Sequence, residues 1–206
     1  MDIDPHDLIE TANSAAEARR DASRASAARL NAAVAVTVAV LATFMGICKV
    51  KDDNIVQAMQ LAQIDRLDHW NFYQARNLRQ QAAEATATQL ELARWAAPAP
   101  AAAAYDTAIA RYRALERDQA VKKDELKALA EQDQHHYDAL NFRDDQFDLS
   151  DAFLAIAIAM LAVTALTRLW PLYWASLVPT AFGVTMGLSG LLALPLHPDA
   201  LVRLLS

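Results

Sequence analysis

The stretch AAPAP, Ala96 to Pro100, decides how this chain folds. A helix has to break there, because proline lacks the backbone N–H and its ring clashes with the preceding turn. On either side lie two polar stretches of nearly equal length, Lys49 to Trp95 and Ala101 to Ser150. The pattern predicts two long helices that double back at the prolines, so that both ends of the polar region return to the same surface.

Apolar runs bracket this polar region. Leu30 to Cys48, LNAAVAVTVAVLATFMGIC, holds 19 residues without a charge, enough to cross a hydrocarbon core of roughly 30 Å at about 1.5 Å per residue. Asp151 to Arg168 is shorter, but it lies beside a third run, Trp170 to Leu196, which begins with aromatic residues that favour a membrane interface. The sequence therefore predicts three membrane spans.

We predict an all-α integral membrane protein with three transmembrane helices and a long antiparallel coiled-coil hairpin between the first and the second. Asp4 as cap and Pro5 as first helical residue predict a helix that begins at Pro5, and nothing before Trp95 forces it to stop. The predicted parts are an N-terminal amphipathic helical segment at 1–29, spans at 30–48, 151–168 and 170–196, the hairpin at 49–150 with its turn at 96–101, and a C-terminal tail at 197–206.

Charges flanking the first span predict its orientation. Four arginines precede it, whereas Lys49 and Lys51 on its far side are followed at once by Asp52 and Asp53. The positive-inside rule then places the N-terminus in the cytoplasm and the hairpin outside. The first thirty residues are mostly polar and predict no cleaved signal peptide. The expected location is the inner (plasma) membrane, with the hairpin in the periplasm.

Net charge and cysteine content exclude some functions. The chain carries a net charge of −6, and Lys51 to Asp148 holds 12 basic and 17 acidic residues. Nucleic acid would be repelled by this region, so the lipid bilayer is the expected contact and nucleic acid is not. Because Cys48 is the one cysteine, an intrachain disulfide is excluded.

Apolar residues of the first arm predict how the hairpin packs. They fit an eleven-residue spacing better than a heptad, which indicates a nearly straight coil; the residues are Val56, Met59, Leu67, Trp70, Leu78 and Leu92, with Gln63, Gln74, Gln81 and Gln89 in the same stripe. The second arm offers an equally thin stripe. A hairpin so poor in apolar contacts is marginal alone, and we expect the arms to pack against other subunits or a partner.

An aromatic group in the first arm is a candidate interaction site. Trp70 and Tyr73 share a helix face, and Gln74 and Arg76 follow. Tryptophan, tyrosine and arginine are frequent interface anchors, so the group could be a docking surface. The favoured interpretation is that it holds the two arms in register, with Arg76 or Arg79 meeting Asp118, Asp124 or Glu125.

Small residues in the spans are the second candidate site. They allow helices to approach closely, and they are Ala35, Ala39, Ala42 and Gly46 in the first span and Gly183 and Gly187 in the third. Packing within one subunit and packing between subunits would use the same groove. No Asp, Glu, Lys, Arg or His lies within residues 30–48, 152–167 or 172–196, which argues against a self-sufficient pump or proton-coupled transporter.

No motif predicts catalysis, and neither a cofactor nor a metal is expected. His135 and His136 point about 100° apart on a helix, which is typical of a solvated face rather than a metal site. Acidic residues before the second span could pair with Lys49 and Lys51; they are Asp144, Asp145, Asp148 and Asp151. A phosphate loop, a nucleophile elbow and a paired zinc-ligand motif are all missing from the sequence.

The order of parts resembles an uncharacterised family of bacterial membrane proteins, catalogued as a domain of unknown function. Trp70 to Arg76 is similar to that family's Trp-x-x-Tyr-Gln-Ala-Lys motif, with arginine in place of lysine, and Phe147 to Ile158 is similar to its entry into the second span. The glycine-containing third span that ends at Leu196-His197 is also similar. The resemblance implies three spans and a helical hairpin, and it implies no catalytic residue.

These features predict a non-enzymatic membrane scaffold or accessory subunit. Its stalk would mediate assembly of a homo-oligomer or docking to a larger membrane protein complex. The alternative is a pore-forming or transport-related homo-oligomer, whose pore would be lined by threonine hydroxyls. The candidates for that lining are Thr37, Thr43, Thr164, Thr180 and Thr185.

Overall fold

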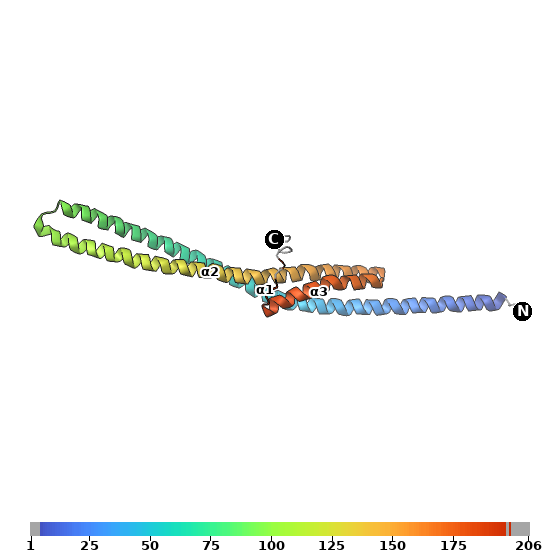
Figure 1. The fold of residues 1–206 in the computed structure, drawn as a ribbon. Helices are drawn as coiled ribbons and strands as arrows, with labels where there is room; N and C mark the ends of the chain where they lie inside the picture. The colour runs from blue at the N-terminus through green and yellow to red at the C-terminus, as the bar shows by residue number, and fades with distance from the viewer. Residues whose placement is uncertain (1–4, 197, 199–206) are drawn as a thin grey trace. The chain divides into compact units, whose positions relative to one another are not determined.

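The computed structural model of the protein describes residues 5–196 and 198, and within them all regular structure is helical. Three helices follow one another, α1 at Pro5–Trp95, α2 at Ala99–Thr167 and α3 at Trp170–Leu192 (Figure 1). The all-α prediction is confirmed for this part of the chain. The predicted cap at Asp4 and, except for Pro198, the predicted tail at 197–206 lie outside the described residues.

Short breaks separate the helices. Residues 96–98 join α1 to α2, and the N–H of Ala101 donates to the Pro98 carbonyl at 2.9 Å. Pro100 is the second residue of α2, where a missing N–H costs nothing because the first N–H groups of a helix have no partner within it. Helix therefore resumes inside the stretch 96–101 that the sequence predicts as a turn.

The break between α2 and α3 depends on a left-handed residue. Arg168 has φ 56°, and its N–H donates to the Thr164 carbonyl at 2.8 Å. This conformation closes α2 and turns the chain, so that α3 can begin at Trp170 with Pro171 in its first turn.

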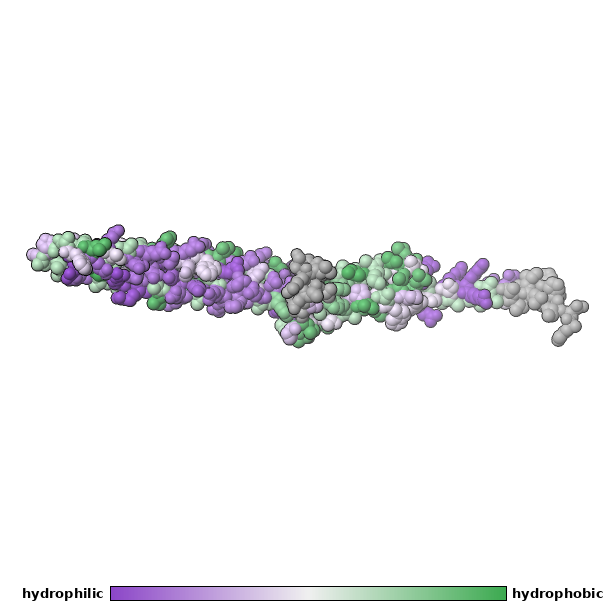
Figure 2. All heavy atoms as spheres, turned by 45° about the horizontal axis from the view of Figure 1, so that its top comes forward, coloured by the Kyte–Doolittle hydropathy of each residue, from purple (hydrophilic) through white to green (hydrophobic). Residues whose placement is uncertain are grey.

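All three helices are long and apolar enough to cross a membrane. The chain divides into two units, which we call the apolar unit, residues up to Asp53 and from Phe142 onward, and the polar unit, Asn54–Asn141. Figure 2 shows mainly hydrophilic side chains on the polar unit and mainly hydrophobic ones on the apolar helices. This division agrees with the predicted separation of membrane spans from a polar region.

The apolar unit has one core, formed where α1 and α2 meet. Its buried members are Leu30, Val34, Leu41, Leu154, Ala157 and Leu161. Two hydrogen bonds attach the start of α3 to α1. The hydroxyls of Thr37 and Tyr173 lie 3.1 Å apart, and the indole N–H of Trp170 donates to the Ser26 hydroxyl at 3.2 Å. The polar edges of these aromatic residues are therefore paired.

Helix α3 packs against its neighbours through glycine. A Cβ added to Gly183 would lie 2.8 Å from Cγ of Leu154 and 3.1 Å from the Leu154 backbone nitrogen. A Cβ on Gly187 would lie 2.7 Å from the Phe44 ring and from the Ser150 hydroxyl. Only a residue without a side chain allows these approaches.

Polar side chains of α2 bind carbonyls in and after the last turn of α3. Arg143 donates to the Gly190 carbonyl at 2.9 Å, which has no partner within the helix because it lies in the last turn. Gln146 is fully buried, and its Nε2 donates to two carbonyls beyond the end of α3, those of Leu194 at 2.8 Å and Leu196 at 2.6 Å. These bonds satisfy groups that would otherwise be costly to bury.

In the polar unit, residues that are buried or half-buried recur at alternating spacings of three and four. We call them the inner seam. Along α1 the seam comprises Ile55, Met59, Ala62, Arg66, His69, Tyr73, Arg76, Gln80, Ala83 and Ala87. Along α2 it comprises Tyr105, Ile109, Tyr112, Glu116, Gln119, Lys123, Leu126, Ala130, Asp133, Tyr137 and Leu140. A spacing of three and four is the heptad pattern.

The predicted eleven-residue stripe holds at Met59, which is buried, and in part at Val56 and Trp70, which are half-buried, but it is wrong for the leucines and glutamines. Leu67, Leu78 and Leu92 have exposed fractions of 59%, 66% and 69%. The four glutamines assigned to the same stripe, Gln63, Gln74, Gln81 and Gln89, are exposed as well. Size explains the error, because the buried positions are filled largely by alanine and by polar side chains, and the larger leucines point outward.

In the polar unit, side chains of α1 contact side chains of α2 in reverse sequence order. Near the turn, Arg94 pairs with Asp106, and Arg113 donates to Glu91 at 3.0 Å. Further from the turn, Arg76 donates to Gln119 at 3.1 Å and His69 contacts Asp133 at 2.7 Å. The partner's number falls along α2 as the residue number rises along α1, and the two segments lie side by side (Figure 1).

We expect Gly183→Ala to destabilise the protein by about 1–3 kcal/mol, because the added methyl overlaps a fully buried Leu154. Gly46→Ala is the matched control, since nothing lies within 4 Å of a Cβ at that position. Thermal unfolding of the detergent-purified protein measures both. Equal midpoints for the two variants would contradict close packing of α3.

Candidate functional site

The middle of the inner seam is a cluster of hydrogen-bonded polar side chains, which we call the central polar cluster. His69 Nδ1 lies 2.7 Å from Asp133 Oδ2, and the two side chains are only 27% and 22% exposed. Arg66 donates to the Gln134 side chain one turn away. Partly buried polar groups in this arrangement retain partners on the opposite helix segment, which limits the cost of their burial.

The predicted aromatic site lies beside this cluster. Tyr73 is part of the inner seam, and the Trp70 ring meets it edge to face at 5.2 Å. Lys123 lies over the Tyr73 ring at 6.0 Å from its centroid, at the limit of a cation–π contact. Trp70 is half-buried and Gln74 is exposed.

Arg76 donates to Gln119, which is 4% exposed, rather than to one of the predicted carboxylates. Its charge nevertheless reaches Asp118. The pKa of Asp118 is lowered, first by a hydrogen bond from Lys122 and to a smaller extent by the charges of Lys122 and Arg76. Of the predicted site residues in the first arm, the structure thus brings Tyr73 and Arg76 into the seam.

The central polar cluster pairs side chains of the two segments. Arg66, His69 and Arg76 each contact a side chain of the opposite segment, which is what a register-setting contact requires. Half-buried charges of this kind add little net stability but select one alignment, because a shifted alignment leaves charges without partners. The cluster can therefore specify which residues of the polar unit face one another.

A second group, in the apolar unit, surrounds the carboxylate of Asp52. Asp52 is 5% exposed, and its Oδ2 accepts from Lys49 Nζ at 2.8 Å. Lys49 also lies 3.4 Å from Asp53. The hydrogen bond to Asp52 is the main cause of a raised pKa at Lys49. Lys49 therefore forms its ion pairs with acids of its own helix, and not with the acids before the second span as predicted.

Those acids instead crowd against Asp52. Burial raises the pKa of Asp144 to about 7, and a hydrogen bond to Asp52 and the charges of Asp148, Asp52 and Asp145 act in the same direction. The pKa of Asp148 is raised too, by partial burial first and then by Asp52 and Asp145. Asp52 Oδ1 is buried and, among the described residues, accepts no hydrogen bond from an N–H or hydroxyl group. A protonated Asp144 carboxyl would be a donor for the Asp52 carboxylate.

A cavity of about 20 Å³ adjoins these carboxylates, enough for a single water. Its lining comprises Cys48, Lys49, Asp52, Phe147, Asp148 and Asp151. Within the described residues, no group of three or more histidine, cysteine or acidic side chains could hold a metal ion. His135 and His136 are both exposed on α2.

The predicted small-residue groove divides into two parts. Gly183 and Gly187 are used inside the chain, against Leu154, Phe44 and Ser150. The small residues of the first span are all exposed; they are Ala35, Ala39, Ala42 and Gly46. Gly183 and Gly187 therefore pack within the chain, whereas the small residues of the predicted first span face outward.

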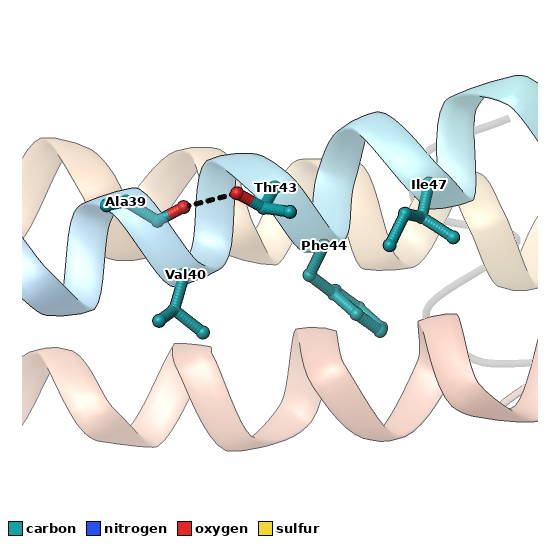
Figure 3. Close-up of a pocket in the computed structure, with 5 residues that line it drawn as sticks. All are labelled: Ala39, Val40, Thr43, Phe44 and Ile47. Atoms are coloured by element: carbon teal, nitrogen blue, oxygen red, sulfur yellow. Dashed lines mark hydrogen bonds between the residues drawn. The ribbon is translucent and has the colours of Figure 1, made fainter.

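A shallow apolar groove of about 370 Å³ runs along the outside of α1 near those residues. Its lining is Ala39, Val40, Thr43, Phe44 and Ile47, and Figure 3 shows the Phe44 ring and Val40 pointing toward the neighbouring α3 ribbon. Thr43 donates to the Ala39 carbonyl at 2.8 Å. With this bond made, the groove offers apolar surface and almost no free polar group.

The threonines considered for a pore are engaged within their own helices. Each hydroxyl donates to the carbonyl four residues earlier, at 2.7–2.9 Å. The five are Thr37, Thr43, Thr164, Thr180 and Thr185. Each hydroxyl thus uses its one donor within its own helix and keeps its capacity to accept a hydrogen bond.

Sequence reasoning missed the buried Asp52 and the capping residues Arg143 and Gln146. A signal existed for Asp52, which follows Cys48 by four residues and precedes Ile55 by three, the spacing of the inner seam. For Gln146 the signal was weaker, a polar residue among acids just before an apolar run. Neither residue belongs to a motif with a recognised spacing.

Comparison with known proteins identifies a family but no activity. Residues 30–193 match the model of a family described as a domain of unknown function, DUF4337. The chain belongs to this family, as the resemblance of its motifs implies. No curated protein and no solved structure matches the chain.

The raised pKa of Asp144 predicts how stability changes with pH. Between pH 3.8, the ordinary value of this carboxyl, and about 7, the folded protein holds a proton that the unfolded chain releases. The free energy of unfolding should therefore fall as pH rises through this window and level off above it. Thermal unfolding of purified protein between pH 4.5 and 8 measures the slope.

Asp144→Asn should flatten this pH dependence and raise the midpoint at pH 8, because the amide is neutral at every pH. Asp124→Asn, at an exposed carboxylate of the polar unit, should leave the slope unchanged. A slope that persists in Asp144→Asn would show that this carboxyl does not hold the proton.

Proposed function

We propose that the protein is a non-enzymatic membrane scaffold or accessory subunit. In this proposal α3 and the apolar parts of α1 and α2 cross the bilayer, and the polar unit forms an antiparallel coiled-coil hairpin outside it. The hairpin mediates oligomerisation or docking to a larger membrane complex. The proposed location is the inner membrane, with a cytoplasmic N-terminus and the hairpin in the periplasm.

Membrane insertion is supported by what the three apolar segments contain. They carry no acidic or basic side chain over residues 30–48, 152–167 and 170–196. Each belongs to a helix long and apolar enough to cross a membrane, and a helix forms its backbone hydrogen bonds internally. Exposed valine and isoleucine on the first span are unfavourable in water and favourable against lipid; they are Val36, Val40 and Ile47.

A hairpin is supported by the descending order of the contacts between α1 and α2. The contacts extend from Arg94 with Asp106, next to the turn, to Arg66 with Gln134. Such an order over most of the polar unit is what two antiparallel helices joined by a short turn would give. The three-and-four spacing of the inner seam supports a coiled coil.

The observation that carries the proposal is the distribution of large apolar side chains in the polar unit. The inner seam uses alanine, tyrosine and charged groups over most of its length, while several large apolar residues are exposed. They include Leu61, Ile64, Phe72, Leu78 and Leu92. Large apolar side chains gain no stabilisation while they face water. Their burial against a partner would be favourable, and exposed apolar patches are typical of interaction surfaces.

The seam's composition adds a reason for a partner. His69, Arg76 and Lys123 together with Asp133 leave the middle of the seam with little apolar burial. Exposed and half-exposed ion pairs of this kind contribute about 0–1 kcal/mol each. Burial of the outer leucines against a second surface would stabilise the hairpin far more, at about 25 cal/mol per Å².

We predict that the protein extracted in a mild detergent is a homo-oligomer or co-purifies with other membrane proteins. Native mass spectrometry of the full chain measures the mass of the complex and identifies its members. A strictly monomeric protein with no co-purifying chain, at concentrations found in the membrane, would contradict the scaffold proposal.

A further inference from the structure

The outward face of α1 in the polar unit carries a second set of residues at alternating spacings of three and four. We call it the outer stripe, residues 61, 64, 68, 71, 75, 78, 82, 85, 89 and 92. Its large members have exposed fractions of 56–69%, and they are Leu61, Ile64, Leu78 and Leu92. Alanine at 75, 82 and 85 keeps the middle of the stripe narrow.

Spacing and charge together indicate what the outer stripe binds. Three-and-four spacing is the pattern by which one helix packs along another, and this stripe would extend about 47 Å along α1 at 1.5 Å per residue. Asp68 is its one charged residue. Because desolvating an unpaired charge is costly, the partner should be a helix face that is itself nearly free of charge.

The corresponding outward face of α2 does not fit that description. At the same spacing it presents three charged residues, three apolar ones, a glutamine and a histidine, all of them exposed: Arg111, Ala114, Asp118, Val121, Glu125, Ala128, Gln132 and His135. The charged face of α2 is therefore a poor match for the outer stripe. The nearly uncharged face of the polar unit that matches it is the same stripe on another copy of the chain.

We infer that two copies of this protein associate through the outer stripe, with the α1 helices of their polar units parallel and in register. This inference rests on the proposed membrane anchoring, which gives every copy the same orientation and concentrates the copies in one bilayer. A symmetric contact between identical parallel helices places each residue opposite its own equivalent. The partner is a second copy of the chain.

The polar residues of the stripe fit this arrangement. Asn71 would face the Asn71 of the second copy, and an asparagine pair within an apolar seam fixes the register of parallel helices. One turn before Asn71, Asp68 would face the Asp68 of the second copy. Repulsion between the two carboxylates weakens association while both are charged. Substitution of Asp68 by asparagine should therefore strengthen the dimer.

Disulfide trapping in the full-length protein, reconstituted into phosphatidylglycerol and phosphatidylethanolamine vesicles, tests the inference. Cys48→Ala removes the one native cysteine, and Leu78→Cys is then introduced. Val121→Cys on α2 is the matched control, because the two side chains are 66% and 59% exposed. Disulfides form when Cα atoms lie about 4.4–6.8 Å apart, so crosslinking reports direct opposition.

We expect most of the Leu78→Cys protein to form covalent dimer on mild oxidation, with at least a tenfold lower yield for Val121→Cys. Adding Ile64→Glu to the Leu78→Cys chain should reduce the yield at least fivefold, whereas adding Leu115→Glu, on exposed α2 surface, should not. Adding Asp68→Asn should raise the yield at low oxidant.

Equal yields at residues 78 and 121, or no dimer at 78, would overturn the inference. If native mass spectrometry still reports an oligomer or a partner protein in that case, the scaffold proposal stands and the contact lies elsewhere. If the protein is monomeric by both measurements, the scaffold proposal and the inference fail together.

Discussion

Close approach of α1 and α2 in the polar unit is favoured because many of the facing side chains are either short or able to hydrogen-bond to one another. Ala62, Ala83, Ala87 and Ala130 are buried at seam positions, and between them lie the paired polar residues. A seam of leucines would hold the segments further apart and without preference for alignment. Here the alignment follows from contacts such as His69 with Asp133, which a shift of one heptad would break. This seam determines which residues of the polar unit face inward and which are left facing outward.

The two units use different small residues to bring their helices close together. In the apolar unit, α3 approaches its neighbours at Gly183 and Gly187, where the absence of a side chain provides room for Leu154 and Phe44. In the polar unit alanine serves the same purpose. Hydrogen bonds from α2 satisfy backbone carbonyls in and after the last turn of α3: Arg143 donates to Gly190 and Gln146 donates to Leu194. Small residues therefore permit contact, and a few polar residues decide the alignment.

Much of this architecture was predictable from the sequence, because prolines and uncharged runs act locally. The start of α1 at Pro5, the break after Trp95 and the three apolar helices follow from such signals. The seam was not predictable in the same way. Leucine was taken as the mark of a buried position, yet Leu67, Leu78 and Leu92 are exposed and alanines are buried. The acids at 144 and 148 were recognised as a cluster, but the burial of Asp52 that shifts their pKa values depends on tertiary contact.

The measurement that tests the inner seam most directly is the protease resistance of the polar unit in two single variants of the full-length protein. Ala87 is fully buried and Leu67 is 59% exposed, so Ala87→Glu places a charge in the seam and Leu67→Glu places one in water. We predict that Ala87→Glu speeds cleavage within residues 54–141 at least tenfold, which corresponds to about 1.4 kcal/mol in the opening equilibrium, and that Leu67→Glu leaves the rate within twofold of the unsubstituted protein. Faster cleavage in Leu67→Glu than in Ala87→Glu would restore the eleven-residue stripe and contradict the account.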